Sequence, residues 1–217
     1  PQVDAQWEIT YKVFANGIIK VDNRFVAEGT ETPMIPRVGL RMQLSEILND
    51  LTYYGRGPEE NYRDRRTSQF IGEYTTPIKD LYEPYIRPQE NEHRTDIYWC
   101  ALTTKQKAGL LFIADRTFEL NASNYLLGSL DSGETIDNGA PRTNETNHRH
   151  LTDPQPVKQV DMFIDYRMMG VGGDNSWGAI AHEPYLIRPG VENAIEYGFS
   201  IVPFDKKADY KNLIYQY

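Results

Sequence analysis

The opening of the chain alternates apolar and polar side chains, and this period of two constrains the fold more than any other feature. Two short runs carry the alternation: Trp7, Ile9, Tyr11 and Val13, followed by Ile19, Val21 and Phe25. Between them lies Asn16-Gly17, a dipeptide that favours the positive φ angles of tight hairpin turns. Because successive side chains of a strand point to opposite faces, the sequence predicts an antiparallel β-hairpin.

Many further runs of β-branched and aromatic residues follow, separated by turns rich in Gly, Pro, Asn and Asp. Strands are predicted over Arg37–Leu44, Asp50–Tyr54, Asp96–Thr103, Gly109–Asp115, Phe118–Leu120, Lys158–Asp165, Tyr185–Ile187 and Ala194–Val202. With this many antiparallel candidates and almost no convincing helix, we expect an all-β fold built from two packed sheets. At 217 residues and 40% hydrophobic content, the chain can bury the core of one large domain.

Two regions break the strand pattern. Leu127 to Arg142 is poor in large apolar residues and rich in turn formers, so it is predicted to be an exposed loop or insertion. We place the domain over residues 1–204 and treat 205–217 as a charged tail that ends in Leu213-Ile214-Tyr215. The tail is expected to be a short helix, a docking strand or disordered.

The charge balance narrows the classes of partner. The chain has 23 basic and 31 acidic residues and a net charge of −8, which repels nucleic acid and fits a neutral or polyhydroxylated partner better. Its single cysteine, Cys100, excludes an intramolecular disulfide framework. No apolar run approaches the ~20 residues that cross a bilayer, so no membrane partner is expected. The sequence does not specify a cellular compartment.

The segment from Met169 to Gly178 is the strongest candidate for a binding loop. It is dense in glycine and small polar residues and contains one large aromatic, Trp177. Glycines permit backbone shapes that present a side chain. An indole offers an apolar face and one N–H donor, which suits a sugar ring with its rim of hydroxyls. The alternative is that Trp177 folds back to fill its own core.

Two polar loops are further candidates. Gly55 to Arg65 carries alternating charges, and we favour a loop held by ion pairs, with Arg65 bound to Asp64 or Glu60, over direct ligand contact. Pro84 to Arg94 is stiffened by prolines and offers Glu90, Asn91 and Arg94 to hydroxyl groups. For this second loop, a binding role and a structural role are evenly matched.

The sequence contains no recognisable catalytic or metal motif. His148 and His150 share a face if the segment is extended, but His93 and His182 lie far away with no metal-ligand spacing. We therefore favour structural histidines and expect no metal site. The nucleophile elbow, the phosphate loop and the H-E-x-x-H motif are absent from the sequence. The acidic residues offer no unique pair for a retaining glycosidase.

Six motifs taken together resemble a known family. Their order is that of the C-terminal domain of the large bacterial β-galactosidases of glycoside hydrolase family 2, and the resemblance runs from Trp7 to Pro203. The motifs are Pro36-Arg37-Val38-Gly39-Leu40, Gly55-x-Gly57-Pro58-x-Glu60-Asn61-Tyr62-x-Asp64-Arg65, Tyr85-x-x-Pro88-x-Glu90-Asn91, Phe118-x-x-Asn121-x-Ser123-x-Tyr125, His148-Arg149-His150-Leu151 and Gly170-x-Gly172-Gly173-Asp174-x-Ser176-Trp177. The chain is also similar to the small chain of β-galactosidases that are split into two polypeptides.

The resemblance implies a fold and a division of labour. The fold would be a large antiparallel super-sandwich related to galactose mutarotases. The catalytic glutamates would lie on a separate TIM barrel, so no catalytic residue is expected in this chain. Mg and Na ions would bind to the barrel, the substrate would be a terminal β-galactoside such as lactose, and the full-length enzyme would be a homo-oligomer.

By resemblance, Trp177 matches the family tryptophan that reaches into the sugar site of the barrel and forms a platform for the substrate. Two departures from the family pattern stand out. Leu127 to Arg142 is longer than the usual short helical segment, and the first hairpin begins abruptly, without the additional strands that family domains have before it. A sheet edge left bare near Trp7 would be able to pair with another chain.

Two other readings remain open. The domain is alternatively an autonomous carbohydrate-binding module or a mutarotase-like epimerase that uses its own sheet groove. Glu90, Asn91, Arg94 and His150 are the groove candidates, with His150 and Glu90 as an acid and base if the fold brings them together. In a third reading, the domain only buttresses the barrel and the subunit contacts.

Overall fold

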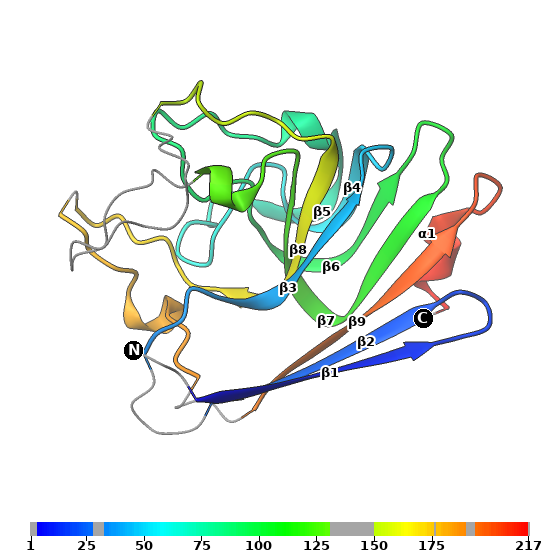
Figure 1. Cartoon of the computed structure of the whole chain (residues 1–217), viewed down its shortest axis with the longest axis horizontal. Coiled ribbons are helices and arrows are strands. Elements are labelled where there is room, and N and C mark those ends of the chain that lie inside the picture. The colour runs from blue at the N-terminus through cyan, green and yellow to red at the C-terminus, as the bar shows by residue number, and fades with distance from the viewer. Residues whose placement is uncertain (1–3, 28–32, 131–149, 176, 190–193, 217) are drawn as a thin grey trace.

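A computed structural model describes residues 4–27, 33–130, 150–175, 177–189 and 194–216 of the chain (Figure 1). The described residues form a nearly all-β fold, as the sequence predicts. The strands are β1 (Ala5–Val13), β2 (Ile19–Ala27), β3 (Arg37–Ser45), β4 (Asp50–Gly57), β5 (Phe70–Pro77), β6 (Arg94–Thr103), β7 (Gly109–Ser123), β8 (Gln159–Met168) and β9 (Ile195–Phe204). The short helices are the 3₁₀ turns η1 (Ile78–Asp80), η2 (Leu127–Leu130) and η3 (Glu183–Tyr185), and the α-helix α1 (Tyr210–Ile214).

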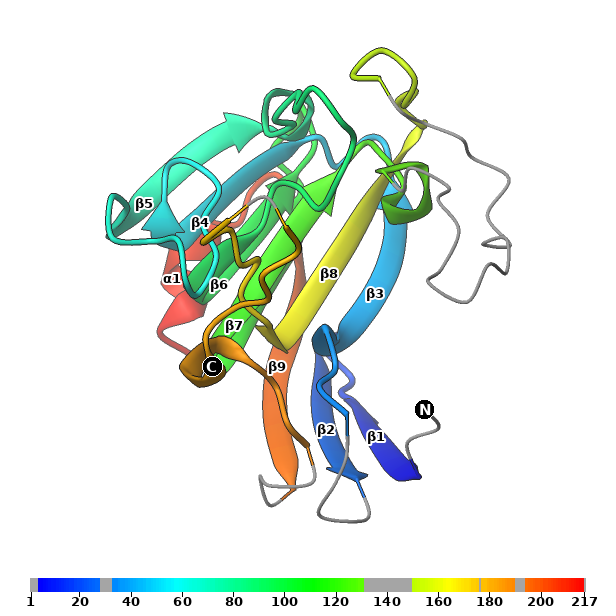
Figure 2. The same ribbon diagram turned by 90° about the vertical axis from the view of Figure 1, so that its left-hand side faces the viewer.

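All nine strands belong to one antiparallel sheet that forks along β7. The main path runs β1-β2-β9-β7-β6-β4-β5, while β8 pairs with β7 and with β3. One edge of β7 changes partner along its length: Gly109–Ala114 pairs with β9, and Glu119–Ser123 pairs with β8. The strands that diverge from this fork, β9 and β8, are both visible beside β7 in Figure 2.

The all-β antiparallel class is confirmed. The expectation of two separate packed sheets is wrong, because all nine strands are joined in one forked sheet. The strand pattern predicts many antiparallel pairs. It does not indicate that one long strand pairs with two different strands along the same edge. The residues at the fork explain the missed connection. The sequence predicts two strands, Gly109–Asp115 and Phe118–Leu120, whereas the structure has one strand of 15 residues with three exposed polar residues, 115–117, in its middle.

The main core lies between the two branches of the fork. Its fully buried side chains come from both branches and from β7 itself, and include Phe112, Phe118, Leu120, Met162 and Phe199. Phe199 packs against the rings of Phe112 and Phe118, with centroids 6.5 and 6.4 Å apart. Truncation of a buried phenylalanine to alanine typically costs about 3–5 kcal/mol, so this cluster contributes much of the stability.

The predicted first hairpin is present. β1 and β2 pair in register from Ala5 with Ala27 to Val13 with Ile19. Gly17 adopts a φ of 86°, and its N–H donates to Phe14 O over 2.9 Å. This positive φ angle favours glycine at position 17.

Two strand predictions require correction. Tyr185–Ile187 is not a strand: Glu183–Tyr185 forms the 3₁₀ turn η3, in which Pro184 lies at the start and favours a turn. Conversely, β5 was missed because its sequence, FIGEYTTP, mixes Gly, Glu and Thr with few apolar residues. It forms an edge of the sheet, pairing with β4 alone among the described residues, and needs little hydrophobic pattern.

The C-terminal tail is a short helix, one of the three expected states. Asp209 Oδ1 accepts a hydrogen bond from Lys211 N over 3.1 Å at the start of α1. Tyr210, Leu213 and Ile214 pack against a second apolar cluster that includes Trp99 and Phe204. Of the predicted exposed region, residues 131–142 lie outside the described residues, as do His148 and Arg149. Among the described residues, no helix combines the length and apolar character needed to cross a bilayer.

Candidate functional site

Trp177 is presented on the loop that follows β8. Its side chain is 92% exposed, so it does not fold back to fill a core. The loop backbone takes positive φ angles at three glycines, with 76° at Gly172, 109° at Gly173 and 85° at Gly178, angles that other residues rarely adopt. Trp177 N donates to Asn175 Oδ1 over 2.8 Å. The loop is thus shaped by its own residues, as predicted.

One carboxylate anchors the base of this loop. Asp64 accepts hydrogen bonds from Val171 N over 3.1 Å and Gly172 N over 2.9 Å, across more than 100 residues of sequence. A Cβ added to Gly170 would lie 2.5 Å from Asp64 Oδ2, so glycine is required there for this close approach. Gly170 N also donates to Tyr185 O over 2.8 Å. The loop is therefore fixed at its base on two sides.

The loop that carries Asp64 is itself braced by ion pairs, as the sequence predicts. Arg65 Nη2 donates to Glu60 Oε1 over 2.6 Å, which is one of the two pairings considered. Arg56 Nε and Arg66 Nη1 both reach Asp96 Oδ2, over 2.7 and 2.9 Å. These charge-assisted bonds hold the loop from both ends.

Two of the proposed groove residues are buried and engaged with the protein. Asn91 is 4% exposed, and its side-chain amide binds both Glu83 N and Glu83 O, over 2.9 and 2.5 Å. Arg94 is also 4% exposed and donates to Tyr53 Oη, Glu92 O and Pro58 O. Both side chains hold loops in place in this structure.

The other two groove residues are not joined to each other. Glu90 accepts from Arg37 Nη2 over 2.9 Å and from Asn121 Nδ2 over 3.2 Å. His150 is exposed, and its backbone N–H donates to Asp153 Oδ2 over 2.9 Å. Among the described residues, no hydrogen bond links His150 to Glu90. The structure does not assemble the acid and base of the mutarotase-like reading.

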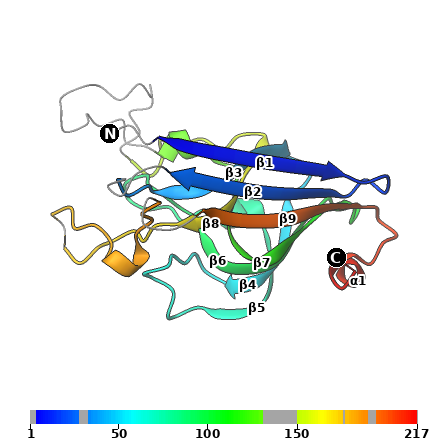
Figure 3. The same ribbon diagram turned by 90° about the horizontal axis from the view of Figure 1, so that it is seen from below.

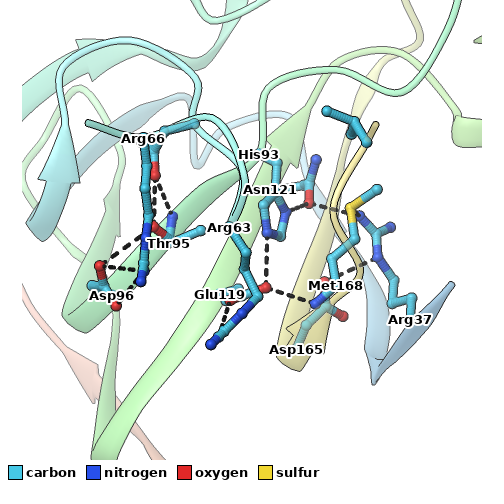
Figure 4. A network of polar contacts seen from close by, with 12 residues as sticks. Arg37, Arg63, Arg66, His93, Thr95, Asp96, Glu119, Asn121, Asp165 and Met168 are labelled. Carbon is cyan, nitrogen blue, oxygen red and sulfur yellow. Dashed lines mark hydrogen bonds and ion pairs between the residues drawn. The ribbon is translucent and has the colours of Figure 1, made fainter. Parts of the chain in front are cut away.

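A buried polar network reaches Met168 at the end of β8, and the sequence does not predict it (Figure 4). At its centre is His93, which is fully buried, with Nδ1 2.7 Å from Asn121 Oδ1 and Nε2 3.0 Å from Glu119 Oε2. Glu119 also accepts from Met168 N over 2.6 Å and from Arg63 Nη1 over 3.1 Å. Because Met168 ends β8, the network fixes the point where the Trp177 loop leaves the sheet.

Opposing effects set the protonation of this network. Burial disfavours the charged form of His93, but its hydrogen bond to Glu119 and the charge of that carboxylate outweigh burial and raise the pKa of His93. Burial likewise disfavours the charged form of Glu119, yet His93, Met168 N and Arg63 together lower the pKa of this carboxyl. Both shifts favour a buried imidazolium–carboxylate pair.

Two other buried carboxyls are shifted the opposite way. Burial raises the pKa of Asp165 to about 7, although Arg37, 3.1 Å away, opposes the shift. Burial also raises the pKa of Glu92 to about 8. Glu92 is 2% exposed, its backbone has a φ of 63°, and its Oε1 has no hydrogen-bond partner. For both carboxyls, burial outweighs the partners that favour ionisation, which include Arg37 for Asp165 and Ser123 for Glu92.

A second feature is a polar cleft of about 810 Å³ at the fork of the sheet. It collects residues from five strands and the loop before β5, with four acidic and four basic side chains: Glu8, Asp22, Asp115, Glu196, Arg24, Arg63, Arg116 and Arg167. A Cβ on Gly198 would lie 2.4 Å from Asp115 Oδ2 and 2.8 Å from Lys20 Nζ. Glycine at this position therefore leaves room for the charged groups of the cleft.

None of the groove residues predicted from the sequence lines this cleft. Its residues are scattered singly over the chain, so no local motif identifies it. Among the described residues, no group of three or more His, Cys, Asp or Glu side chains is placed to hold a metal ion.

Comparisons with known proteins give a consistent result. Residues 1–201 match the family model described as β-galactosidase small chain. The chain is 32% identical over 179 residues to a β-galactosidase of Priestia megaterium and 31% identical over 182 residues to one of Lactococcus lactis. These matches cover 82% and 83% of this chain but only 16% of each relative. The chain thus spans about a sixth of the length of these relatives.

Proposed function

Because the chain belongs to the β-galactosidase small chain family, we propose that it is the C-terminal, sugar-facing domain of a larger β-galactosidase. The enzyme hydrolyses terminal β-D-galactosides such as lactose, with retention of configuration. Two glutamates on a separate TIM barrel act as acid/base and nucleophile. This domain supplies no catalytic residue and contributes a wall of the sugar site.

The observation that carries this proposal is the exposed Trp177 on an anchored loop. The indole is 92% exposed, so no packing within this chain has to be broken before a sugar contacts it. Its apolar face suits the C–H face of a galactose ring. Stacking of this kind contributes about 1 kcal/mol beyond the area that it buries. The contribution is enough to position a substrate or acceptor sugar without performing chemistry.

The test is kinetic and uses the full-length enzyme. Trp177→Ala should raise KM about five-fold, which corresponds to the loss of about 1 kcal/mol of stacking. It should change kcat for a substrate with a good leaving group much less. Trp177→Phe, which keeps an aromatic face, should restore most of the binding. Phe70→Ala removes an aromatic side chain that is 73% exposed elsewhere and serves as the control.

A complete loss of turnover by folded Trp177→Ala enzyme would contradict the proposal, because it would assign a chemical role to this domain. Unchanged KM and kcat would also contradict it. Mg and Na binding belongs, in this proposal, to the barrel, and the full-length enzyme is a homo-oligomer.

The polar cleft favours a second candidate function, an autonomous carbohydrate-binding domain. Its volume of about 810 Å³ suits a small oligosaccharide. Its equal numbers of acidic and basic groups suit hydroxyls, which both donate and accept. Calorimetric titration of galactose and lactose into this chain separates the two functions. Saturable binding that survives Trp177→Ala would support the autonomous module, whereas no binding by either protein would support a site shared with the barrel.

A further inference from the structure

The Trp177 loop is anchored at its base, but the position of its tip depends on a further contact. Asp64 binds two backbone N–H groups at the start of the loop, well before the indole. Gly173 and Gly178 lie on either side of the tip and adopt positive φ angles. Among the described residues, a Cβ added to either glycine would meet no heavy atom within 4 Å. Close packing at these two positions therefore does not hold the tip in place.

One side-chain contact spans this tip. His182 Nε2 forms a hydrogen bond with Asp174 Oδ2, and the two residues lie on opposite sides of Trp177 in the sequence. The residue after Asp174 also contacts the tip, because Trp177 N donates to Asn175 Oδ1 over 2.8 Å. The Asp174–His182 contact, which we call the clasp, thus closes a short ring of chain that contains Trp177.

The His182 end of the clasp is bound to the base of the loop. His182 O accepts from Tyr185 N over 2.8 Å at the start of η3, and Tyr185 O accepts from Gly170 N over 2.8 Å. Ala181, the neighbour of His182, is only 4% exposed. The loop and η3 lie together at the end of the molecule opposite to α1 (Figure 1 and Figure 3). The clasp therefore connects the glycine-rich tip to an anchored part of the chain.

Protonation of His182 strengthens the clasp. The hydrogen bond to Asp174 and the charge of that carboxylate raise the pKa of His182 above its ordinary value of 6.5, with a smaller contribution from the charge of Asp64. The other charged groups of this segment, Glu183 and Arg188, bind each other, with Arg188 Nη2 3.0 Å from Glu183 Oε2. Because folding raises this pKa, the ion-pair contribution is fully present below pH 6.5 and is lost as pH increases through the folded-state pKa.

We propose that Asp174 and His182 are positioning residues of the β-galactosidase, which hold the Trp177 indole in the orientation that stacks on the galactose ring. This inference rests on the proposed function, which assigns Trp177 to sugar binding. A sugar binds more tightly to an indole that is already held in place than to one that must first be ordered. The clasp acts through the indole, so its loss should change KM far more than kcat. Both side chains are exposed, by 66% at His182 and 63% at Asp174, so the effect should be smaller than that of removing the indole.

The test is a double-mutant cycle on lactose hydrolysis by the full-length enzyme. His182→Ala should raise KM about two-fold, with kcat nearly unchanged, because an exposed ion pair is weak. In the Trp177→Ala background, the same substitution should raise KM no further, because the clasp acts through the indole. Asp174→Ala is an independent variant with the same expected result. Glu183→Ala removes the neighbouring exposed ion pair with Arg188, which does not span Trp177, and serves as the matched control.

The pH dependence distinguishes this positioning role from a general structural one. His182→Gln keeps an N–H donor for Asp174 but carries no charge at any pH. Its KM should exceed that of the wild type at about pH 6, where His182 is protonated, and should equal it at about pH 9, where His182 is neutral. The ratio of the two KM values cancels the titration of groups elsewhere in the enzyme.

Equal KM values for His182→Ala and the wild type would overturn the inference. A rise in KM that is just as large in the Trp177→Ala background would also overturn it, as would a KM ratio for His182→Gln that does not change with pH. The failure of the proposed function gives a different result. Trp177→Ala with an unchanged KM refutes the proposed function, whereas a raised KM for Trp177→Ala with an unchanged KM for His182→Ala refutes only the positioning role.

Discussion

Trp177 and Trp7 are both exposed aromatic residues, yet their surroundings differ. Trp177 stands alone on a glycine-rich loop whose base is fixed by Asp64. Trp7 lies in a regular strand, in line with three other exposed apolar side chains, and among the described residues this strand pairs along one edge alone. A single aromatic on a rigid polar frame suits a small ligand, while an apolar row beside free backbone groups suits polypeptide. The exposure of an aromatic side chain does not by itself identify its function, whereas the residues around it do.

The first test of this comparison removes the carboxylate of Glu119 from the buried polar network around His93. Glu119→Ala should destabilise the protein by about 3–5 kcal/mol, because it leaves the buried charge of His93 uncompensated. Urea unfolding of the full-length enzyme followed by tryptophan fluorescence measures the change. Glu73→Ala removes an exposed ion pair with Lys211 and should leave the transition unchanged. An equally unchanged unfolding transition for Glu119→Ala would show that the buried polar network does not stabilise the protein.

The second test examines the buried carboxyl of Glu92 through the pH dependence of stability. Its pKa rises from 4.5 to about 8 on folding, so between these values the folded state holds a proton that the unfolded state has released. The free energy of unfolding therefore falls as pH increases through this window. Glu92→Gln removes that contribution, so its stability relative to the wild type should increase by about 2–4 kcal/mol from pH 5 to pH 9.

Denaturant unfolding of both proteins at these two pH values measures the difference. Exposed Glu59→Gln provides the matched control and should show a constant offset from the wild type. The same constant offset for Glu92→Gln would mean that Glu92 is ionised in the folded protein at neutral pH.

The third way acts on the base of the Trp177 loop. Asp64→Ala removes the acceptor of two backbone N–H groups and should weaken the local structure by about 1–2 kcal/mol. Amide exchange at residues 169–175 should accelerate and KM should rise, with global stability less affected. Asp64→Asn keeps one oxygen acceptor and should be intermediate. Unchanged exchange in Asp64→Ala would show that the loop does not depend on this carboxylate.

Local features were predictable from the sequence, and long-range ones were not. The β1–β2 hairpin follows from alternation and Asn16-Gly17 over a short stretch. The exchange of partners along β7 depends on residues 195–204 and 159–168. No local pattern records which distant strand pairs with each half of β7. β5 failed for a different reason, since an exposed edge strand needs no apolar periodicity.

The candidate site shows the same division. The exposure of Trp177 agrees with the glycine-rich sequence around it, because those glycines shape the loop locally. The polar groups of Asn91 and Arg94 make them candidates in the sequence, but in the fold the backbone of Glu83 occupies the amide of Asn91. The guanidinium of Arg94 is occupied by distant partners, among them Tyr53 and Pro58. The pairing of His93 with Glu119 joins residues 26 positions apart, and no local sequence pattern links the two.

The most direct test of the central claim is a structure of the full-length enzyme, with its nucleophile inactivated, bound to lactose. We predict that the Trp177 indole lies face to face with a sugar ring, with heavy atoms about 4.0–4.5 Å apart, and that both catalytic glutamates come from outside this chain. A Trp177 side chain buried in a contact between domains or subunits, away from any sugar, would contradict the account and assign the domain a buttressing role.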